Sequence, residues 1–478
     1  MRISLQHLGW TTAALGLLGL IGCPMSGDDD DMAYGGGGYG DDDDDVESER
    51  VFGPDDVEDD VCVEVPAEPT TWFVSADDSN SMAQPTLFRR AIEAGYPIQA
   101  APRLYEFLNY YSFDFGPGSE VRLVPQLRRT EEGALSLLVA VVAPDKANTA
   151  RRPLNLTFSL DLSGSMGDYG IAGLQSAVRA IVGELQSGDM VSMVEWSTSQ
   201  TVLVSSRTVS GPNDPTLLGV VAGLSPGGGT DLDGGLARAY ALAWQNWSAT
   251  SLNRVILISD GGANVGVTSA ELIAQHAEDG QSDGVYLGAI GAGSIQESLM
   301  DTITDLGKGA YMYIDSDAEA ARLLGGDRFL AAVDLAARDV QLALTLPEGV
   351  VIDHFSGEEI SANPDEVRPQ HLAPNDSMLY HFDLVDCTEE ASGRLVGLEV
   401  TWLEPFTGEQ RSTSMTVDWD ALLAGPSDAV LKADAIVRYA RIAGGEALDA
   451  QLVYDAAAAL PTDTDLAEVA GLTQLVAP

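Results

Sequence analysis

Five oxygen-bearing side chains, far apart in the sequence, could together bind a metal ion. Asp161, Ser163 and Ser165 share the segment Asp-Leu-Ser-Gly-Ser, Thr230 follows three glycines, and Asp260 precedes two more. Carboxylate and hydroxyl oxygens without histidine or cysteine suit a hard cation, Mg²⁺ first and Mn²⁺ or Ca²⁺ next. The neighbouring glycines let the backbone turn tightly and leave such an ion accessible. The sequence therefore predicts a divalent-cation site at these five residues.

The segments around these residues predict a sheet that could gather them on one rim. Strands are predicted at 154–160, 190–196, 201–205, 255–258, 285–290 and 310–314, and helices at 170–186, 236–247, 269–281 and 295–306. The link between the second and third strands is too short for a crossover, so that pair must be antiparallel. The helix at 236–247 carries an apolar stripe that includes Trp244 and Trp247, and we expect both in the core. The fold class is a doubly wound α/β fold with a mostly parallel sheet and one antiparallel edge strand, whose ligands bind at the carboxyl ends of the strands.

Further segments flank the α/β region on both sides. Before it, helices are expected at 87–94 and 104–111, and strands at 119–127 and 134–143. After it come a helix at 318–337, strands at 340–346, 377–384, 394–403 and 411–417, and an alanine-rich helical tail from residue 429. The expected domains are a signal peptide (1–22), an acidic tether (23–70), an N-terminal flanking domain (71–152), the α/β domain (153–325), a β-rich antiparallel domain (326–420) and a helical segment (421–478).

The five-residue pattern resembles the metal-ion-dependent adhesion site of von Willebrand factor type A (VWA) domains. An Asp-x-Ser-x-Ser segment, a threonine in a glycine-rich loop and an Asp-Gly pair after a strand match at all five positions. The resemblance implies direct metal ligation by Ser163, Ser165 and Thr230. It also implies that Asp161 and Asp260 hold waters, and that a sixth position stays open for a partner's carboxylate. The alternative is that these residues are capping hydroxyls and turn glycines.

The resemblance extends to a bacterial lipoprotein family in which a VWA domain lies between family-specific N- and C-terminal domains. It is carried by residues 264–269, 309–315, 87–90 and 104–111. The family often has an aspartate where this chain has Gly262, which is not a ligand position. The family resemblance implies a site and no substrate.

The N-terminus resembles a lipoprotein signal peptide. Arg2 precedes an apolar stretch at 8–21 that is too short to span a bilayer comfortably and ends in Leu-Ile-Gly-Cys, the pattern of a lipobox. By that resemblance, cleavage precedes Cys23, which carries lipid and anchors the chain stably through several acyl groups. Neither residue 24 nor residue 25 is aspartate, so the common inner-membrane retention signal is absent and we expect the outer membrane, with the leaflet left open. A buried N-terminal helix is the alternative.

The charge excludes two classes of partner. The net charge of −48 excludes non-specific nucleic-acid binding and electrostatic attraction to an anionic membrane. Between residues 23 and 60 there are 16 acidic residues and one arginine, which predicts an extended, self-repelling tether. A cation-binding or export-related tag is the alternative for this stretch.

Two further cysteines remain if Cys23 is lipidated. Outside the cytoplasm Cys62 and Cys387 could form a disulfide that ties the N-terminal part to the β-rich part. Sequence does not determine the distance between them, so the bonded and free forms both remain open.

The expected function is binding of a protein partner without catalysis. The chain is expected to be a lipid-anchored protein of the cell envelope whose cation attracts an Asp, Glu or C-terminal carboxylate on the partner, with no nucleic acid and no small-molecule substrate. One alternative is a structural or assembly lipoprotein of an envelope complex, in which the metal only stabilises the fold. Another is a Mg²⁺-dependent hydrolase, for which no general base is evident. A serine hydrolase is disfavoured because Ser163 replaces the first glycine of the nucleophile elbow and no motif surrounds the histidines 276, 354, 371 and 381.

Overall fold

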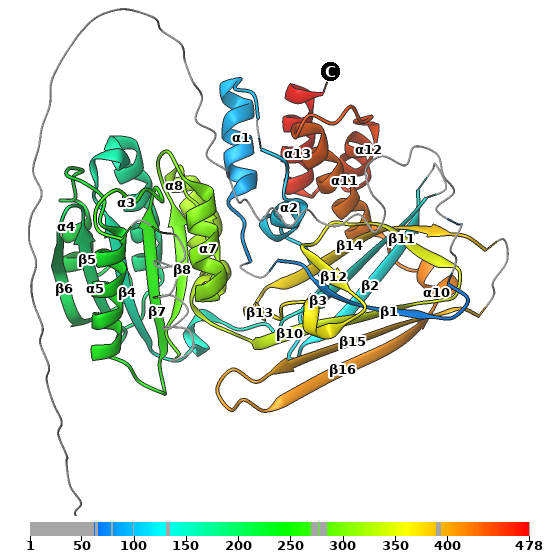
Figure 1. Cartoon of the computed structure of the whole chain (residues 1–478), viewed down its shortest axis with the longest axis horizontal. Coiled ribbons are helices and arrows are strands. Elements are labelled where there is room, and N and C mark those ends of the chain that lie inside the picture. The colour runs from blue at the N-terminus through cyan, green and yellow to red at the C-terminus, as the bar shows by residue number, and fades with distance from the viewer. Residues whose placement is uncertain are drawn as a thin grey trace, which may run out of the picture. The chain divides into compact units, whose positions relative to one another are not determined.

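The structure is a computed structural model that describes residues 62, 66–77, 80–98, 100–130, 134–267, 269, 276, 284–388 and 393–477 (Figure 1). The signal peptide with Cys23, nearly all of the acidic tether and most of the helix expected at 269–281 lie outside these residues. Within the described ranges, no helix combines the length and the apolar character needed to cross a membrane.

A six-stranded sheet forms the centre of the α/β domain. Its strands are β4 (Leu154–Asp161), β5 (Met190–Trp196), β6 (Gln200–Thr208), β7 (Leu252–Ser259), β8 (Tyr286–Gly291) and β9 (Tyr311–Tyr313), in the order β6-β5-β4-β7-β8-β9. Only the β5–β6 pair is antiparallel, and the other neighbours are parallel. The predicted doubly wound fold with one antiparallel edge strand is confirmed.

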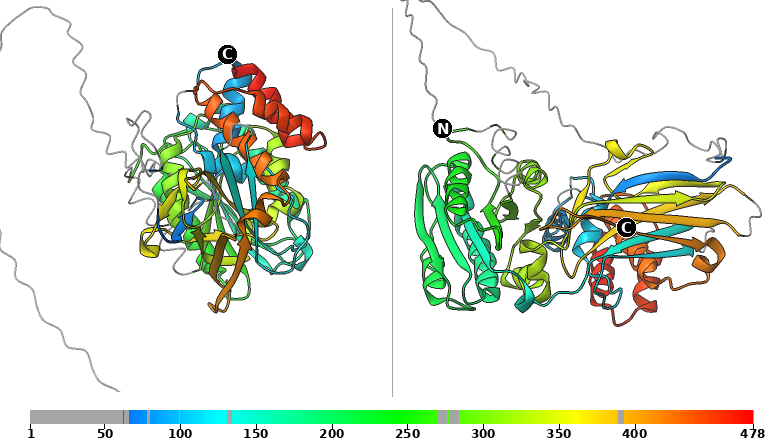
Figure 2. Two further views of the ribbon diagram at one scale, coloured as in Figure 1. Left: turned by 90° about the vertical axis from the view of Figure 1, so that its right-hand side faces the viewer. Right: turned by 90° about the horizontal axis from the view of Figure 1, so that it is seen from below.

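Helices cover both faces of this sheet (Figures 1 and 2). Side chains alternate across each strand, so Ile256 and Ile258 pack with α3 (Gly167–Glu184), α4 (Pro215–Val221) and α8 (Asp317–Leu324). Val255 and Leu257 pack with α5 (Leu232–Gln245) and α7 (Glu297–Gly307) on the other face. This double coverage explains why β4 and β7 consist of buried residues throughout.

The expected burial of the two tryptophans is wrong. Trp244 is 37% exposed and Trp247 43%, and their rings stack against each other with centroids 6.2 Å apart. The buried face of α5 consists of residues such as Leu236, Ala239 and Ala243, whereas Trp247 lies beyond the end of the helix at Gln245. The helical stripe therefore does not continue to it.

The single helix expected at 318–337 is also wrong. Helix α8 ends at Leu324, a 3₁₀ turn spans Gly326–Arg328, α9 spans Phe329–Val333, and Ala337 already begins a strand. Gly325 has an extended backbone, and a β-carbon there would lie 2.5 Å from the Ala321 carbonyl oxygen. Gly326 has φ of +58°, a conformation that glycine adopts without penalty. The two glycines therefore break the apolar periodicity into two short helices.

The segments flanking the α/β domain form one β-sandwich together. One sheet contains β1 (Thr70–Ser75), β10 (Ala337–Leu346), β12 (Glu359–Ser361), β13 (Gln370–Leu372), β15 (Leu395–Leu403) and β16 (Gln410–Asp418). The other, in the order β11-β14-β3-β2, contains β2 (Arg122–Arg129), β3 (Leu135–Val142), β11 (Val350–Phe355) and β14 (Ser377–Asp386). Segments 71–152 and 326–420, expected as separate domains, thus share both sheets. The reason is that β1 pairs with β10, and β3 with β14, across the intervening α/β domain.

Helices cover the outer face of the second sheet. In β3, Leu137 and Val139 face the sandwich core, while Leu138 and Ala140 pack with the helices. These helices are α1 (Gln84–Ala94), α2 (Leu104–Tyr110), α11 (Asp428–Ala443), α12 (Gln451–Ala459) and α13 (Thr464–Val476), with α10 (Trp419–Leu423) beside β2. The predicted apolar stripe of α11 is confirmed: Val430, Ala433, Ile436, Val437 and Ala440 are all buried.

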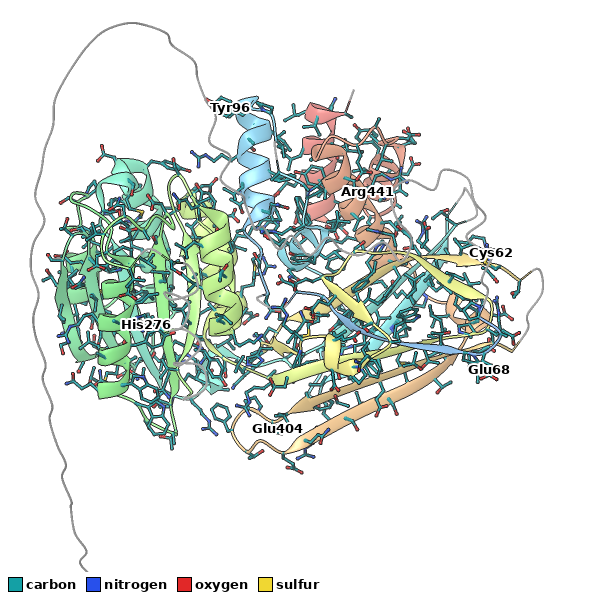
Figure 3. All side chains as sticks on the ribbon, viewed as in Figure 1. Cys62, Glu68, Tyr96, His276, Glu404 and Arg441 are labelled. Carbon is teal, nitrogen blue, oxygen red and sulfur yellow. A yellow bond between two sulfur atoms is a disulfide. The ribbon has the colours of Figure 1, made fainter. Side chains whose placement is uncertain are left out.

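A disulfide joins the two segments that flank the α/β domain. Cys62 and Cys387 are bonded, with their Cα atoms 5.5 Å apart although 325 residues separate them (Figure 3). The backbone nitrogen of Cys387 donates to Gly349, and that of Gly349 donates to Pro66, so both flanking segments meet here.

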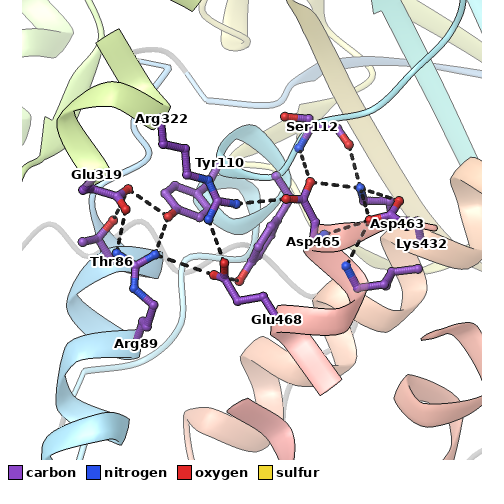
Figure 4. Close-up of polar contacts among 12 residues, drawn as sticks. Thr86, Arg89, Tyr110, Ser112, Glu319, Arg322, Lys432, Asp463, Asp465 and Glu468 are labelled. Atoms are coloured by element: carbon purple, nitrogen blue, oxygen red, sulfur yellow. Dashed lines mark hydrogen bonds and ion pairs between the residues drawn. The ribbon is translucent and has the colours of Figure 1, made fainter. Parts of the chain in front are cut away.

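Charged side chains tie the last helix of the α/β domain to the flanking helices (Figure 4). Glu319 on α8 accepts hydrogen bonds from Arg89 of α1 (2.7 Å) and Tyr110 of α2 (2.8 Å). Arg322, one turn along α8, donates on α13 to the carboxylates of Asp465 (3.0 Å) and Glu468 (2.8 Å). We call these six residues the α8 clamp. It fixes α1 beside the β9 edge of the sheet, where Met82 also donates its backbone N–H to Tyr311.

Candidate metal site

Backbone hydrogen bonds join three loops: the loop after β4, the turn after β5 and the glycine-rich loop that leads into α5. After β4, the nitrogen of Gly164 donates to Gly228 (3.1 Å), and the nitrogen of Gly227 donates to Leu162 (2.7 Å). The nitrogen of Asp231 donates to Ser197, in the turn after β5 (2.8 Å). The structure therefore brings the Asp-x-Ser-x-Ser segment and the glycine-rich loop together on one rim, as the sequence predicts.

Asp161 is a buried carboxylate at the end of β4. It is 0% exposed, accepts the backbone N–H of Ser163 (2.8 Å) on Oδ1 and accepts the hydroxyl of Ser259 (2.7 Å) on Oδ2. The pKa of Asp161 is raised to about 6: burial is the largest cause, the hydrogen bonds from Ser259 and Ser163 oppose the rise, and the Asp260 carboxylate adds to it. Ionising Asp161 therefore costs free energy unless a positive charge lies nearby.

The hydroxyl ligands lie next to this carboxylate. The Oγ atoms of Ser163 and Ser165 are 2.9 Å apart, with Ser163 buried and Ser165 exposed. These two oxygens are close enough to bind one cation together. Because Ser165 is exposed, the cation would remain accessible from solvent.

Asp260 lies across the rim from these serines, at the end of β7. Its Oδ1 accepts the N–H of Gly262 (3.0 Å). A β-carbon built on Gly262 would lie 3.1 Å from that oxygen and 4.0 Å from Ser165 Oγ, so Asp260 and Ser165 flank the same small space. Gly261 has φ of +76°, and a β-carbon there would meet the carbonyl oxygen of Gln296 at 2.6 Å. The Asp-Gly pair is thus required by backbone geometry.

Thr230 is buried and held by a residue that sequence reasoning missed. Asn264 Oδ1 accepts the N–H of Thr230 (2.8 Å), and the N–H groups of Asn264 and Val265 both donate to the carbonyl of Thr230 (3.0 Å each). Ser259, which orients Asp161, was also missed as a site residue. Its position as the last residue of a buried strand, directly before Asp260, is the signal that could have identified it.

The arrangement fits a cation better than an empty polar cluster. In the described part of the chain, no arginine, lysine or histidine forms an ion pair with Asp161 or Asp260. Nor do three His, Cys, Asp or Glu side chains gather there as a conventional metal cluster. Hydroxyls supply three of the five oxygens, which suits Mg²⁺ or Mn²⁺.

Among the described residues, no histidine is hydrogen-bonded to Ser163 or Ser165. His276 contacts Asp233 (2.9 Å; Figure 3), and His354, His371 and His381 belong to sandwich strands. His381 bridges Ser356 (3.0 Å) and Asp434 (2.8 Å) in a Ser-His-Asp order. All three side chains are buried, so a substrate has no access to Ser356, and the cluster links β14 to α11.

Comparisons with known proteins show which proteins the chain resembles. The family model of the von Willebrand factor type A domain matches residues 155–325, which include all five site residues. The uncharacterized protein YfbK of Escherichia coli is 26% identical over 395 residues, and the match covers 79% of this chain and 64% of that protein's length.

Two solved structures resemble this chain at low identity and low TM-score. A von Willebrand factor type A protein from Catenulispora acidiphila is 17% identical with a TM-score of 0.44, covering 76% of this chain and 89% of that one. The manganese-loaded TRAP protein of Plasmodium vivax is 14% identical with a TM-score of 0.31, covering 60% of this chain and 98% of that one. Residues 155–325 of this chain thus match the family model of the von Willebrand factor type A domain and have a VWA-like α/β fold.

Proposed function

We propose that this protein binds a partner protein through a divalent cation held on the rim of its VWA domain. The observation that carries the proposal is the pair of carboxylates, Asp161 and Asp260. They lie beside two adjoining serine hydroxyls, and among the described residues no Arg, Lys or His forms an ion pair with either carboxylate. A bound cation would balance their charge and leave a net attraction for a further carboxylate.

Each site residue then has a distinct role. Ser163, Ser165 and Thr230 provide hydroxyl ligands, while Asp161 and Asp260 provide negative charge and positions for water. Ser259 orients Asp161 through its hydroxyl (2.7 Å), and Asn264 fixes the backbone of Thr230 (2.8 Å). Mg²⁺ is the first candidate, with Mn²⁺ and Ca²⁺ next.

The charge of the chain defines the partner's chemistry. A partner that offers an Asp, Glu or C-terminal carboxylate is repelled at long range by a chain of net charge −48 and attracted at close range by the cation. Moderate salt should strengthen binding, because screening weakens the long-range repulsion more than the contact at the metal.

Calorimetric titration of the full chain in detergent tests the metal site. Native protein should bind Mg²⁺ or Mn²⁺ at millimolar concentration or below, and Asp161→Ala should not. Asp168→Ala is the matched control, since it removes an exposed carboxylate from the first turn of α3 and should keep metal binding. Absence of metal binding by native protein, or equal binding by Asp161→Ala, would overturn the proposal.

Partner capture separates this function from a purely structural role for the metal. Native protein should retain proteins from envelope extract in Mg²⁺ and lose them in EDTA, and Asp161→Ala should retain none of them. If the same proteins remain bound in EDTA, the metal serves the fold of an assembly lipoprotein and not the contact.

We further propose that Cys23 carries lipid and anchors the chain in the cell envelope, with the outer membrane as the expected location. Cys23→Ser should abolish labelling by a fatty-acid probe and leave the chain uncleaved in the membrane or free of it. Labelling that persists in Cys23→Ser would refute the anchor.

A further inference from the structure

An arginine from outside the VWA domain is held at the edge of the metal-site rim. Arg90 belongs to α1, and its guanidinium lies 4.4 Å from the centroid of the Tyr169 ring. Its Nη1 donates to the hydroxyl of Tyr313 (2.6 Å), which in turn donates to the carbonyl of Gly293 (2.6 Å). The stack and the hydrogen bond hold the exposed guanidinium in one place.

These contacts place Arg90 near the proposed cation. Tyr169 is four residues after Ser165, in the first turn of α3. Gly293 belongs to the loop after β8, and Gln296 of the same loop donates its N–H to the backbone carbonyl of Asp260 (2.8 Å). Tyr313 ends β9, which lies two strands from β7, so its backbone is about 9.5 Å from the end of β7. The Tyr313 hydroxyl is hydrogen-bonded to Gly293 in the loop after β8, and that loop lies between β9 and the candidate metal site.

The described loops of the rim supply no positively charged side chain of their own to an acidic ligand. The described loops at 161–166, 197–199, 227–231, 260–267, 292–296 and 314–316 contain aspartates and no lysine or arginine. Arg89 is already engaged with Glu319 in the α8 clamp. In the part of the chain that the structure describes, Arg90 forms no ion pair with a carboxylate, so its charge is available to a ligand.

We propose that Arg90 is a specificity-determining residue that binds a second carboxylate of the partner, while the cation binds the first. This inference rests on the proposed function and narrows its partner to a ligand with two acidic groups about 10 Å apart. Three residues of chain reach about 10 Å, and a flexible Gly-Gly spacer lets both carboxylates turn toward one surface, as in Asp-Gly-Gly-Glu. Because Tyr169 and Tyr313 already hold the guanidinium, little further ordering is needed on binding.

Two short peptides test the inference on the full chain in detergent with Mg²⁺. Both are N-terminally fluorine-labelled and C-terminally amidated, one with the sequence Asp-Gly-Gly-Glu and the other Asp-Gly-Gly-Gln, and their dissociation constants are measured by ¹⁹F NMR. Native protein should bind the Glu peptide about fivefold more tightly, the upper range for one exposed charge pair. Arg90→Gln should bind both peptides with the affinity of the Gln peptide.

Two controls separate charge from fold. Arg238→Gln removes an exposed arginine from α5, which covers the face of the sheet opposite to α3. This variant should keep the fivefold preference for the Glu peptide. Arg90→Gln should keep native Mg²⁺ binding, which reports an intact metal site.

The outcomes separate a failure of the role assigned to Arg90 from a failure of the proposed metal-dependent function. Equal affinity of native protein for both peptides, or equal weakening of both by Arg90→Gln, overturns the role of Arg90 and leaves the metal site standing. If neither peptide binds in a Mg²⁺-dependent way, the proposed function fails and the inference fails with it.

Discussion

Replacing Asp161 with asparagine should stabilise the metal-free protein and abolish its stabilisation by metal. Asparagine has nearly the same shape, and its Oδ1 can still accept the N–H of Ser163, which is 2.8 Å from the carboxylate oxygen. It removes a buried negative charge that burial and Asp260 both oppose. The substitution therefore separates two contributions to the free energy of unfolding: the cost of an ionised Asp161 in the metal-free protein, and the stabilisation gained when metal binds.

The pKa of Asp161 determines the size and sign of the effect. Burial raises the folded-state pKa from 3.8 to about 6, so the folded state binds this proton more tightly than the unfolded state does. Below about pH 4 both states are protonated and the residue costs nothing. Between pH 4 and 6 the native chain loses stability relative to Asp161→Asn, and above pH 6 the loss is complete at about 3 kcal/mol. Mg²⁺ at 100 times its dissociation constant would return about 2.7 kcal/mol to native protein alone.

Thermal unfolding in EDTA and in MgCl₂ measures both parts. At pH 8 in EDTA, Asp161→Asn should unfold about 6–12 °C above the native protein, at about 2–4 °C per kcal/mol for a domain of this size. Near pH 4 the difference should vanish, and in saturating Mg²⁺ at pH 8 it should shrink to a few degrees. A less stable Asp161→Asn in EDTA at pH 8, or the same difference at both pH values, would refute the reasoning.

Three further predictions concern the scaffold. Arg151 and Asp189 form a buried pair in which Asp189 also accepts the N–H groups of Leu154 and Gln186, so Arg151→Met should cost about 3–5 kcal/mol in denaturant unfolding, and Arg151→Met/Asp189→Asn should cost less. The Cys62–Cys387 bond closes a loop of 325 residues, so Cys387→Ser should cost about 5 kcal/mol, and non-reducing mass mapping that finds two free thiols would contradict the bond. Burial disfavours protonated His381, but the hydrogen bond and charge of Asp434 outweigh it and raise the His381 pKa. That stabilisation is full below about pH 6.5 and is lost as pH rises through the folded-state pKa, so His381→Gln should flatten the stability profile above pH 6.5, and an unchanged profile would contradict this.

Local spacing in the sequence was enough to predict the α/β domain and to name its candidate site residues. Alternating apolar runs identified the six strands, and the short link after Trp196 required an antiparallel edge strand. The Asp-x-Ser-x-Ser, glycine-rich and Asp-Gly segments follow β4, precede α5 and follow β7, so the parallel topology brings them to one rim. These features depend on residues a few positions apart, which a sequence displays directly.

Only the tertiary structure decided how the flanking segments combine. Strand β1, which begins at the last residue of the expected tether, was not predicted, and its pairing with β10 joins residues 268 to 276 positions apart. The three-residue strands β12 and β13 carry no periodic signal. The exposure of Trp244 and the position of Arg90 beside Tyr169 likewise depend on how segments distant in sequence pack. Such contacts form because packing buries apolar surface and satisfies backbone groups across the whole molecule, and no local pattern records which distant segments will meet.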